Sequence, residues 1–166
     1  MSRIQYQHTY DYIISLENLL DAWTEFTKGK RSRADVQVFE RNLMANIISL
    51  HRALVVKTYV HSAYRIFKIA DPKPRVIHMP SVRDRLLHHA LHRKLSPFFT
   101  NTFIADSNSC QVGKGSHRVL RRFGKFINVV SENNTKTVWV LKCDIRKFFA
   151  SINQAILLDI TAEYIP

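Results

Sequence analysis

Apolar residues recur at intervals of three and four over most of this chain, which is the spacing of one buried face of an α-helix. The stretches with this pattern are residues 10–27, 35–57, 82–96, 117–130 and 147–163. Apolar stripes of this kind are buried against one another in folded domains. We therefore expect a mostly helical protein whose stripes form its core. In residues 117–130 the stripe consists of Val119, Phe123, Phe126 or Ile127, and Val130.

Two short stretches alternate instead, and they are rich in β-branched and aromatic residues: residues 64–69 and 75–79. The sequence ADPKP lies between them and carries two prolines, which is typical of a turn. Pro80 stops the second strand, because proline cannot donate a ladder hydrogen bond. These features predict a β-hairpin and place the chain in the α+β class.

Local signals predict where several helices begin and end. Ser81 can cap the helix that follows the hairpin, with Asp84 at the third helical position, in a shorter form of the capping box. Pro97 should end that helix. Ser116 can cap the next helix, and the polar sequence SENNTK at residues 131–136 predicts a turn after it.

Charge is the strongest global feature of the sequence. Its 166 residues include 25 Lys and Arg against 13 Asp and Glu, and residues 28–125 alone hold 20 of the cations but 5 of the acids. Because these cations are spread over several predicted elements, they indicate a broad basic surface. Nucleic acid is the commonest partner of such a surface, and a merely solvated basic protein is the alternative.

Composition also bears on location. The longest apolar runs are far too short to span a bilayer, so no membrane partner is expected. The first residues, MSRIQYQHTY, lack the apolar region of an export signal. Cys110 and Cys143 form neither a disulfide framework nor a metal-binding spacing. A cytoplasmic location is the natural expectation.

The sequence VWVLKCDIRKFFASI, residues 138–152, predicts a strand over residues 138–143 that is apolar on both faces. It ends on Asp144 and leads into the last helix. A carboxylate at such an edge could bind Mg²⁺, together with the backbone carbonyl of Ile145. Alternatively, Asp144 simply caps the following helix.

Other polar residues also allow two interpretations. The hairpin carries Arg65, Lys68, Lys73 and Arg75, which could hold a triphosphate or could be a solvated edge. The sequence GKGS at residues 113–116 could bind phosphate at a helix start or be an ordinary turn. His88, His89 and His92 have no fourth ligand at a suitable spacing, and a basic amphipathic helix accounts for them.

The order of these motifs is more specific than any one of them. The sequences FKIADPKPRVIHMPSVRDRLLHHALHRKLSPFF (67–99), FIADSNSCQVGKGSHRVLRRF (103–123) and VWVLKCDIRKFFASI follow one another. In this order they resemble the front part of bacterial reverse transcriptases of the group II intron, retron and diversity-generating retroelement types. The resemblance covers roughly residues 10–160.

The resemblance implies a right-hand polymerase fold, with residues 1–137 as fingers and 138–166 as the start of the palm. Its partners would be an RNA template, an RNA–DNA duplex and a dNTP, and its cofactor Mg²⁺. Asp144 matches the first metal-binding aspartate, beside the Ile145 carbonyl, and Phe149 matches the gate that excludes a ribose 2′-hydroxyl. The triphosphate would be bound by Arg75, with Lys68 or Lys73. The cations expected to bind nucleic acid are Lys114, Arg118, Arg121 and Arg122.

The chain departs from that family at the second acidic motif, an aromatic residue, any residue and two aspartates. No two acids are adjacent anywhere in the sequence. Two-metal phosphoryl transfer needs both carboxylate sets, so we expect a truncated enzyme that is inactive alone. The alternatives are a non-catalytic RNA-binding module, such as a maturase-like or assembly factor, and one half of a split polymerase. Self-association through the unpaired strand 138–143 is a further expectation.

Overall fold

The computed structural model describes residues 6, 7 and 9–165, and these residues form an α+β protein of helices and one hairpin. The chain divides into two compact units. Residues 7–98 form one, here named the N-terminal unit, and residues 1–6 with 99–166 form the other, the C-terminal unit. The expected boundary between fingers and palm, after residue 137, is a functional assignment and stays a prediction.

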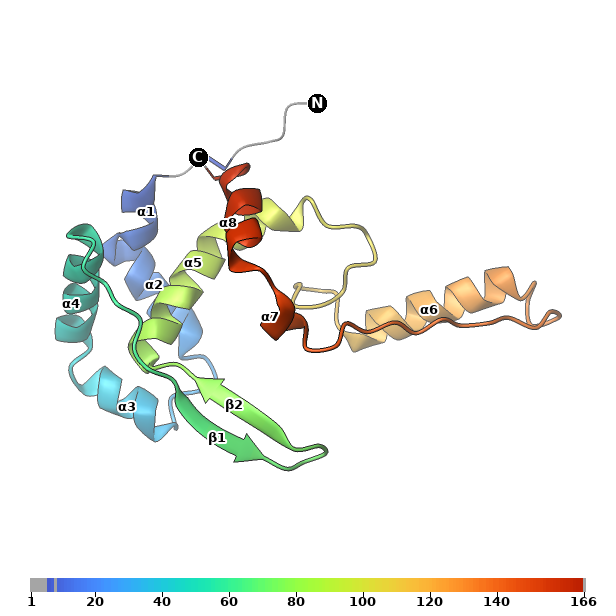
Figure 1. Cartoon of the computed structure of the whole chain (residues 1–166), viewed down its shortest axis with the longest axis horizontal. Coiled ribbons are helices and arrows are strands. Elements are labelled where there is room, and N and C mark those ends of the chain that lie inside the picture. The colour runs from blue at the N-terminus through green and yellow to red at the C-terminus, as the bar shows by residue number, and fades with distance from the viewer. Residues whose placement is uncertain (1–5, 8, 166) are drawn as a thin grey trace. The chain divides into compact units, whose positions relative to one another are not determined.

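The described part of the N-terminal unit contains four helices, a hairpin and most of a long fifth helix (Figure 1). They are α1 (Tyr10–Ile14), α2 (Leu16–Phe26), α3 (Ala34–Arg41), α4 (Leu43–Val55), β1 (Arg65–Ile69), β2 (Arg75–Met79) and α5 (Val82–Thr100). The hairpin has the predicted antiparallel pairing, and β2 ends directly before Pro80. No helix in the described part of the chain is both long enough and apolar enough to cross a membrane.

The core of this unit consists of the predicted stripes. Its buried members are Ile14, Leu19, Ala22, Trp23, Phe26, Val36, Ile47, Leu50, Leu54, Val82, Leu86, Leu87 and Ala90. They come from all five helices, so the amphipathic faces do bury one another here. The Trp23 ring packs against Phe39 with centroids 5.1 Å apart, which joins α2 to α3.

Three helix predictions for this unit were wrong in their limits. Residues 10–27 form two helices because Ser15 adopts an extended conformation, and its Oγ accepts the Asn18 N–H at 3.2 Å as the cap of α2. Residues 35–57 also break, at Asn42, whose backbone leaves the helical region with φ of −121° and ψ of 39° and whose side chain makes no capping hydrogen bond. Pro97 does not end α5, which continues to Thr100. A proline this near the end of a helix removes one backbone hydrogen bond without stopping the last turn.

In its described residues, the C-terminal unit contains three further helices: α6 (Ser116–Val130), α7 (Phe148–Ser151) and α8 (Gln154–Ala162). Gly115, not Ser116, is the N-cap of α6. The chain reverses direction in the predicted polar turn after α6 (Figure 1). The expected helix over residues 147–163 is broken, because Asn153 Oδ1 accepts the N–H groups of Ala155 at 3.0 Å and Ile156 at 3.3 Å and so starts α8 anew.

The expected strand at residues 138–143 does not form. These residues make no backbone hydrogen bond to any other described residue, and a strand exists only when its N–H and C=O groups are paired. Trp139 is 94% exposed and Leu141 is 88% exposed. This segment therefore presents both apolar side chains and free backbone groups.

Such a segment is a template for pairing with another chain, so we expect the protein to self-associate through residues 138–143 at micromolar concentration. Replacing Trp139 and Leu141 by lysine should give a monomer in sedimentation velocity. Ile104→Lys with Val112→Lys is the matched control, because both are exposed apolar residues of the same unit. A wild-type monomer, or equal dissociation by both pairs, would count against the idea.

Candidate nucleotide and nucleic-acid interface

The hairpin presents its four cations to solvent. Arg65, Lys68, Lys73 and Arg75 are exposed, and none of their side chains makes a hydrogen bond or ion pair with another described residue. Ile69 pairs with Arg75, and Lys68 pairs with Val76. Because directly opposed residues project from the same face, Arg75 and Lys68 project from opposite faces of the hairpin. Lys73 lies in the connection between the strands.

The base of the hairpin is fixed by a buried carboxylate, Asp84. Its Oδ1 accepts from the Tyr59 hydroxyl at 2.7 Å, and its Oδ2 accepts from the Ser81 hydroxyl at 2.6 Å and the Ser62 N–H at 3.2 Å. Ser81 Oγ in turn accepts the Asp84 N–H at 3.2 Å, which confirms the predicted capping pair. Since residues 62 and 81 flank the hairpin, Asp84 holds both of its ends.

This network shifts two pKa values in opposite directions. Burial alone would raise the pKa of Asp84, but the hydrogen bonds from Ser81, Tyr59 and Ser62 outweigh it and lower the pKa to about 2. Burial, together with the hydrogen bond to the Asp84 carboxylate, raises the pKa of Tyr59 to about 12. The network is therefore stable with Asp84 ionised and Tyr59 protonated.

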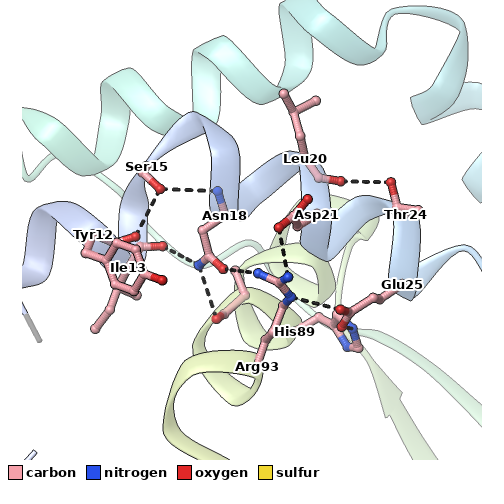
Figure 2. A network of polar contacts seen from close by, with 11 residues as sticks. Tyr12, Ile13, Ser15, Asn18, Leu20, Asp21, Thr24, Glu25, His89 and Arg93 are labelled. Carbon is pink, nitrogen blue, oxygen red and sulfur yellow. Dashed lines mark hydrogen bonds and ion pairs between the residues drawn. The ribbon is translucent and has the colours of Figure 1, made fainter.

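A second polar network joins α2 to α5 through Arg93 (Figure 2). The guanidinium donates to Asn18 Oδ1 at 3.0 Å, Asp21 Oδ2 at 2.8 Å and Glu25 Oε1 at 2.9 Å. Its hydrogen bond to Glu25 lowers the pKa of that carboxyl. Arg93 therefore stabilises the packing of α2 against α5, although it belongs to the basic segment of residues 28–125.

Two of the three histidines of α5 have structural surroundings, and the third, His92, is exposed. His89 Nε2 lies 3.3 Å from Glu25 Oε2, and the His88 ring stacks on His61 with centroids 5.4 Å apart. Burial, followed by the nearby His61, lowers the pKa of His88. Across residues 6, 7 and 9–165, no three His, Cys, Asp or Glu side chains gather where they could hold a metal ion.

Helix α6 carries a row of cations on one face. Arg118, Arg121, Arg122 and Lys125 line a shared concavity, here named the α6 basic groove. Their spacing of three, four and seven residues brings them to one side of a helix. Three of the four cations predicted to bind nucleic acid are members. Lys114 precedes the helix and does not line the groove, and Lys125 was missed because the motif GKGSHRVLRRF ends before it.

Two of the groove cations are engaged by the loop before the helix. Arg122 donates through Nη2 to Asp106 Oδ2 at 2.7 Å, and Arg118 donates to Asn108 Oδ1 and, at 3.1 Å, to the Ala105 carbonyl. The hydrogen bond from Arg122 lowers the pKa of the Asp106 carboxyl. Arg121 and Lys125 are exposed, and among the described residues the Arg121 side chain hydrogen-bonds only to the carbonyl of His117 in its own helix, at 3.4 Å.

The apolar face of α6 was expected to be core, and this was wrong. Val119, Phe123, Phe126 and Val130 are all exposed. A regular stripe shows which face a helix can bury, but burial also requires a partner surface. In the C-terminal unit, the described residues offer no apolar cluster that covers it.

Asp144 is exposed, and its carboxylate makes one hydrogen bond within the described residues. Its Oδ1 accepts the N–H of Ile145 at 3.0 Å, and its other oxygen has no partner among the described residues. It does not cap the following helix, because α7 begins at Phe148 and is preceded by Lys147 in a left-handed conformation, with φ of 52°. The interpretation of Asp144 as a simple helix cap was therefore wrong.

Phe149, the expected sugar gate, is 87% exposed and packs its ring edge-on against Phe148, with centroids 5.2 Å apart. The concavity beside Asp144 is lined by Cys143, Asp144, Ile145 and Phe148. Phe148 was not predicted as a site residue. Only its position within the pair of phenylalanines could have suggested it.

These residues fit part of a Mg²⁺ site. The ion prefers carboxylate oxygens and usually takes one or two carboxylates from the protein, with substrate phosphates and water completing its shell. Asp144 supplies one carboxylate with a free oxygen, next to the Ile145 peptide group. A second carboxylate set, which two ions need, is not brought to this position by the described residues.

The predicted site residues divide between the two units. The hairpin cations belong to the N-terminal unit, whereas Asp144, Phe149 and the α6 basic groove belong to the C-terminal unit. Each group of residues is described within its own unit, and the hypothesis that the two groups form one nucleotide site stays a prediction.

Comparison with known proteins adds no family to this description. No protein-family model matches the chain, and no curated protein is significantly similar to it. The likeness to reverse transcriptases therefore rests on the order and wording of the three motifs.

Proposed function

We propose that this chain forms the fingers and the start of the palm of an RNA-directed DNA polymerase. Its own contribution would be to bind the RNA template and RNA–DNA duplex, to grip the incoming dNTP, and to supply one carboxylate of the metal site. The complete enzyme would add dNTPs to a primer 3′-hydroxyl.

One observation carries the proposal: the hairpin cations, which the motif order assigns to the triphosphate, have different surroundings from the cations that stabilise the fold. Arg85 and Arg93 pair with carboxylates of other helices. The hairpin cations, by contrast, are exposed and unpaired within the described chain. Exposed arginine and lysine side chains without carboxylate partners can bind the oxygens of a triphosphate.

Each assigned residue then has a specific task. Arg75, with Lys73, would neutralise and orient the triphosphate, and Asp84 would hold the hairpin that carries them. The expectation that Lys68 could share this task with Arg75 does not fit the hairpin, because the two side chains project from opposite faces. Phe149 would exclude a 2′-hydroxyl, and Asp144 would hold Mg²⁺. When bound, that ion supplies charge neutralisation at the phosphates. The α6 basic groove would bind phosphates of the nucleic acid backbone.

Primer extension tests the catalytic part of the proposal. With an RNA template, a DNA primer, dNTPs and Mg²⁺, the chain as given should extend no primer, because its sequence holds one metal-site carboxylate where two sets are needed. Asp144→Ala is the matched variant and should behave identically. Robust extension that is abolished by Asp144→Ala would show that a complete site exists in these 166 residues.

A non-catalytic RNA-binding module is the second candidate function. The observation in its favour is the lone carboxylate of Asp144, combined with a basic groove that needs no metal to bind phosphate. The two candidates differ in whether the hairpin is expected to bind a dNTP. A polymerase fragment should bind dNTP at the hairpin, whereas an RNA-binding module should not.

A further inference from the structure

The loop before α6 places an acid against the cations that are proposed to bind RNA. Asp106 is an exposed residue of this loop, and its carboxylate pairs with Arg122. Arg118 is held by the same loop, through Asn108 and the Ala105 carbonyl. The loop therefore occupies hydrogen-bonding positions on two of the four cations in the α6 basic groove.

The position of Asp106 is one that a phosphate oxygen would also favour. Arg122, Arg118 and Lys114 all lower the pKa of its carboxyl, so the carboxylate lies in the combined field of three cations. All three belong to the set that the sequence assigns to nucleic acid. A carboxylate and a phosphate make the same paired hydrogen bonds to a guanidinium.

We propose that Asp106 is an internal competitor for RNA phosphates in the α6 basic groove. A phosphate that binds Arg122 must displace the Asp106 carboxylate or share the guanidinium with it. The loop thus lowers the affinity of the groove and favours ligands that present several phosphates, which can also engage Arg121 and Lys125. This inference rests on the proposed RNA-binding function of α6.

The loop has contacts of its own that do not depend on the Asp106 carboxylate. Gln111 Nε2 donates to the carbonyl and the hydroxyl of Ser107, both at 2.9 Å, and Asn108 Nδ2 donates to the Asp106 carbonyl at 2.6 Å. Asp106→Asn keeps the size of the side chain and removes its charge. The variant should therefore leave the loop folded while freeing Arg122.

The test compares Asp106→Asn with Glu132→Gln in binding a fluorescein-labelled oligouridine, followed by anisotropy. Glu132 is a matched control because it forms an exposed ion pair with Lys136 in the same unit, beyond the C-terminal end of α6. Both variants remove one negative charge and one surface ion pair. Circular dichroism confirms that each retains its helices.

Asp106→Asn should bind oligouridine about fivefold more tightly than wild type at 0.1 M salt, which is the value of one added phosphate contact on single-stranded nucleic acid. Glu132→Gln should change affinity by less than about twofold, because salt screens the interactions of exposed charges beyond roughly 10 Å. In Asp106→Asn combined with Arg122→Gln, the gain should disappear.

Each other outcome overturns the inference. An unchanged affinity shows that Asp106 does not compete, and a weaker one shows that it positions Arg122 for the ligand. Equal gains in both variants show an unspecific charge effect. If wild type and Asp106→Asn both fail to bind, the RNA-binding function of α6 fails too, whereas binding by wild type without a gain in Asp106→Asn rejects the competitor alone.

Discussion

Replacing Arg118, Arg121, Arg122 and Lys125 by glutamine is expected to weaken RNA binding by about two orders of magnitude at 0.1 M salt. Each cation that neutralises a phosphate releases a counterion, so log K falls with log salt by roughly 0.7 per contact on a single strand. Because Asp106 occupies Arg122 in the wild type, about three contacts are removed, and the slope of log K against log salt should become shallower by about 2. Anisotropy titrations at several salt concentrations measure both quantities.

The matched control replaces four exposed cations of the N-terminal unit, Lys28, Arg41, Arg52 and Lys57. It removes the same net charge but leaves the α6 basic groove intact, so the loss should be much smaller. Because phosphate contacts carry little sequence information, the groove variant should lose affinity for all RNA sequences alike. Similar losses in the two variants would show that overall charge, not the groove, binds RNA.

Asp84→Ala is expected to lower the free energy of unfolding of the N-terminal unit by about 3 kcal/mol. The change leaves the Tyr59 hydroxyl, the Ser81 hydroxyl and the Ser62 N–H without their acceptor at a fully buried position. Urea unfolding measures the loss. Asp11→Ala, at an exposed acid in the first turn of α1, should cost less than about 1 kcal/mol. Equal costs would contradict the role of Asp84.

The same carboxylate predicts how stability depends on pH. The pKa of Asp84 is about 2 in the folded chain, below its ordinary value of 3.8. The unfolded chain therefore takes up this proton first as the pH falls. The resulting stabilisation, about 2 kcal/mol, is fully present above pH 5 and is lost between about pH 4 and pH 2. Asp84→Asn should lack this part of the acid-induced loss.

Local signals in the sequence predicted the features of the N-terminal unit well. The prolines between the strands predicted the hairpin, and the Ser81–Asp84 pair predicted the start of α5. Both signals depend on neighbouring residues alone, and both predictions were confirmed. The breaks at Ser15 and Asn42 were not foreseen, because the apolar stripes continue across them. Serine and asparagine inside such a pattern are weak signals whose effect depends on the packing of the neighbouring helices.

Features that need a distant partner could not be predicted from the chain alone. Residues 138–143 have strand composition, but a strand requires another strand to pair with. The stripe of α6 shows a possible buried face and not the surface that would cover it. In the candidate site, the cations were found from composition and motif. The engagement of Arg122 by Asp106, sixteen residues earlier in the chain, was visible only in the structure.

Nucleotide binding at the hairpin is the most direct test of the proposed polymerase function. In an NMR titration of the ¹⁵N-labelled chain with dTTP and Mg²⁺, the backbone amides of residues 65–79 should shift. Arg75→Gln should weaken the response by about fivefold or more, since it removes a charge-assisted phosphate contact worth at least 1 kcal/mol. Arg41→Gln should leave it unchanged, and thymidine should cause no shift. If the hairpin amides do not shift with dTTP, or shift equally with thymidine, the assignment of this chain to polymerase fingers is contradicted.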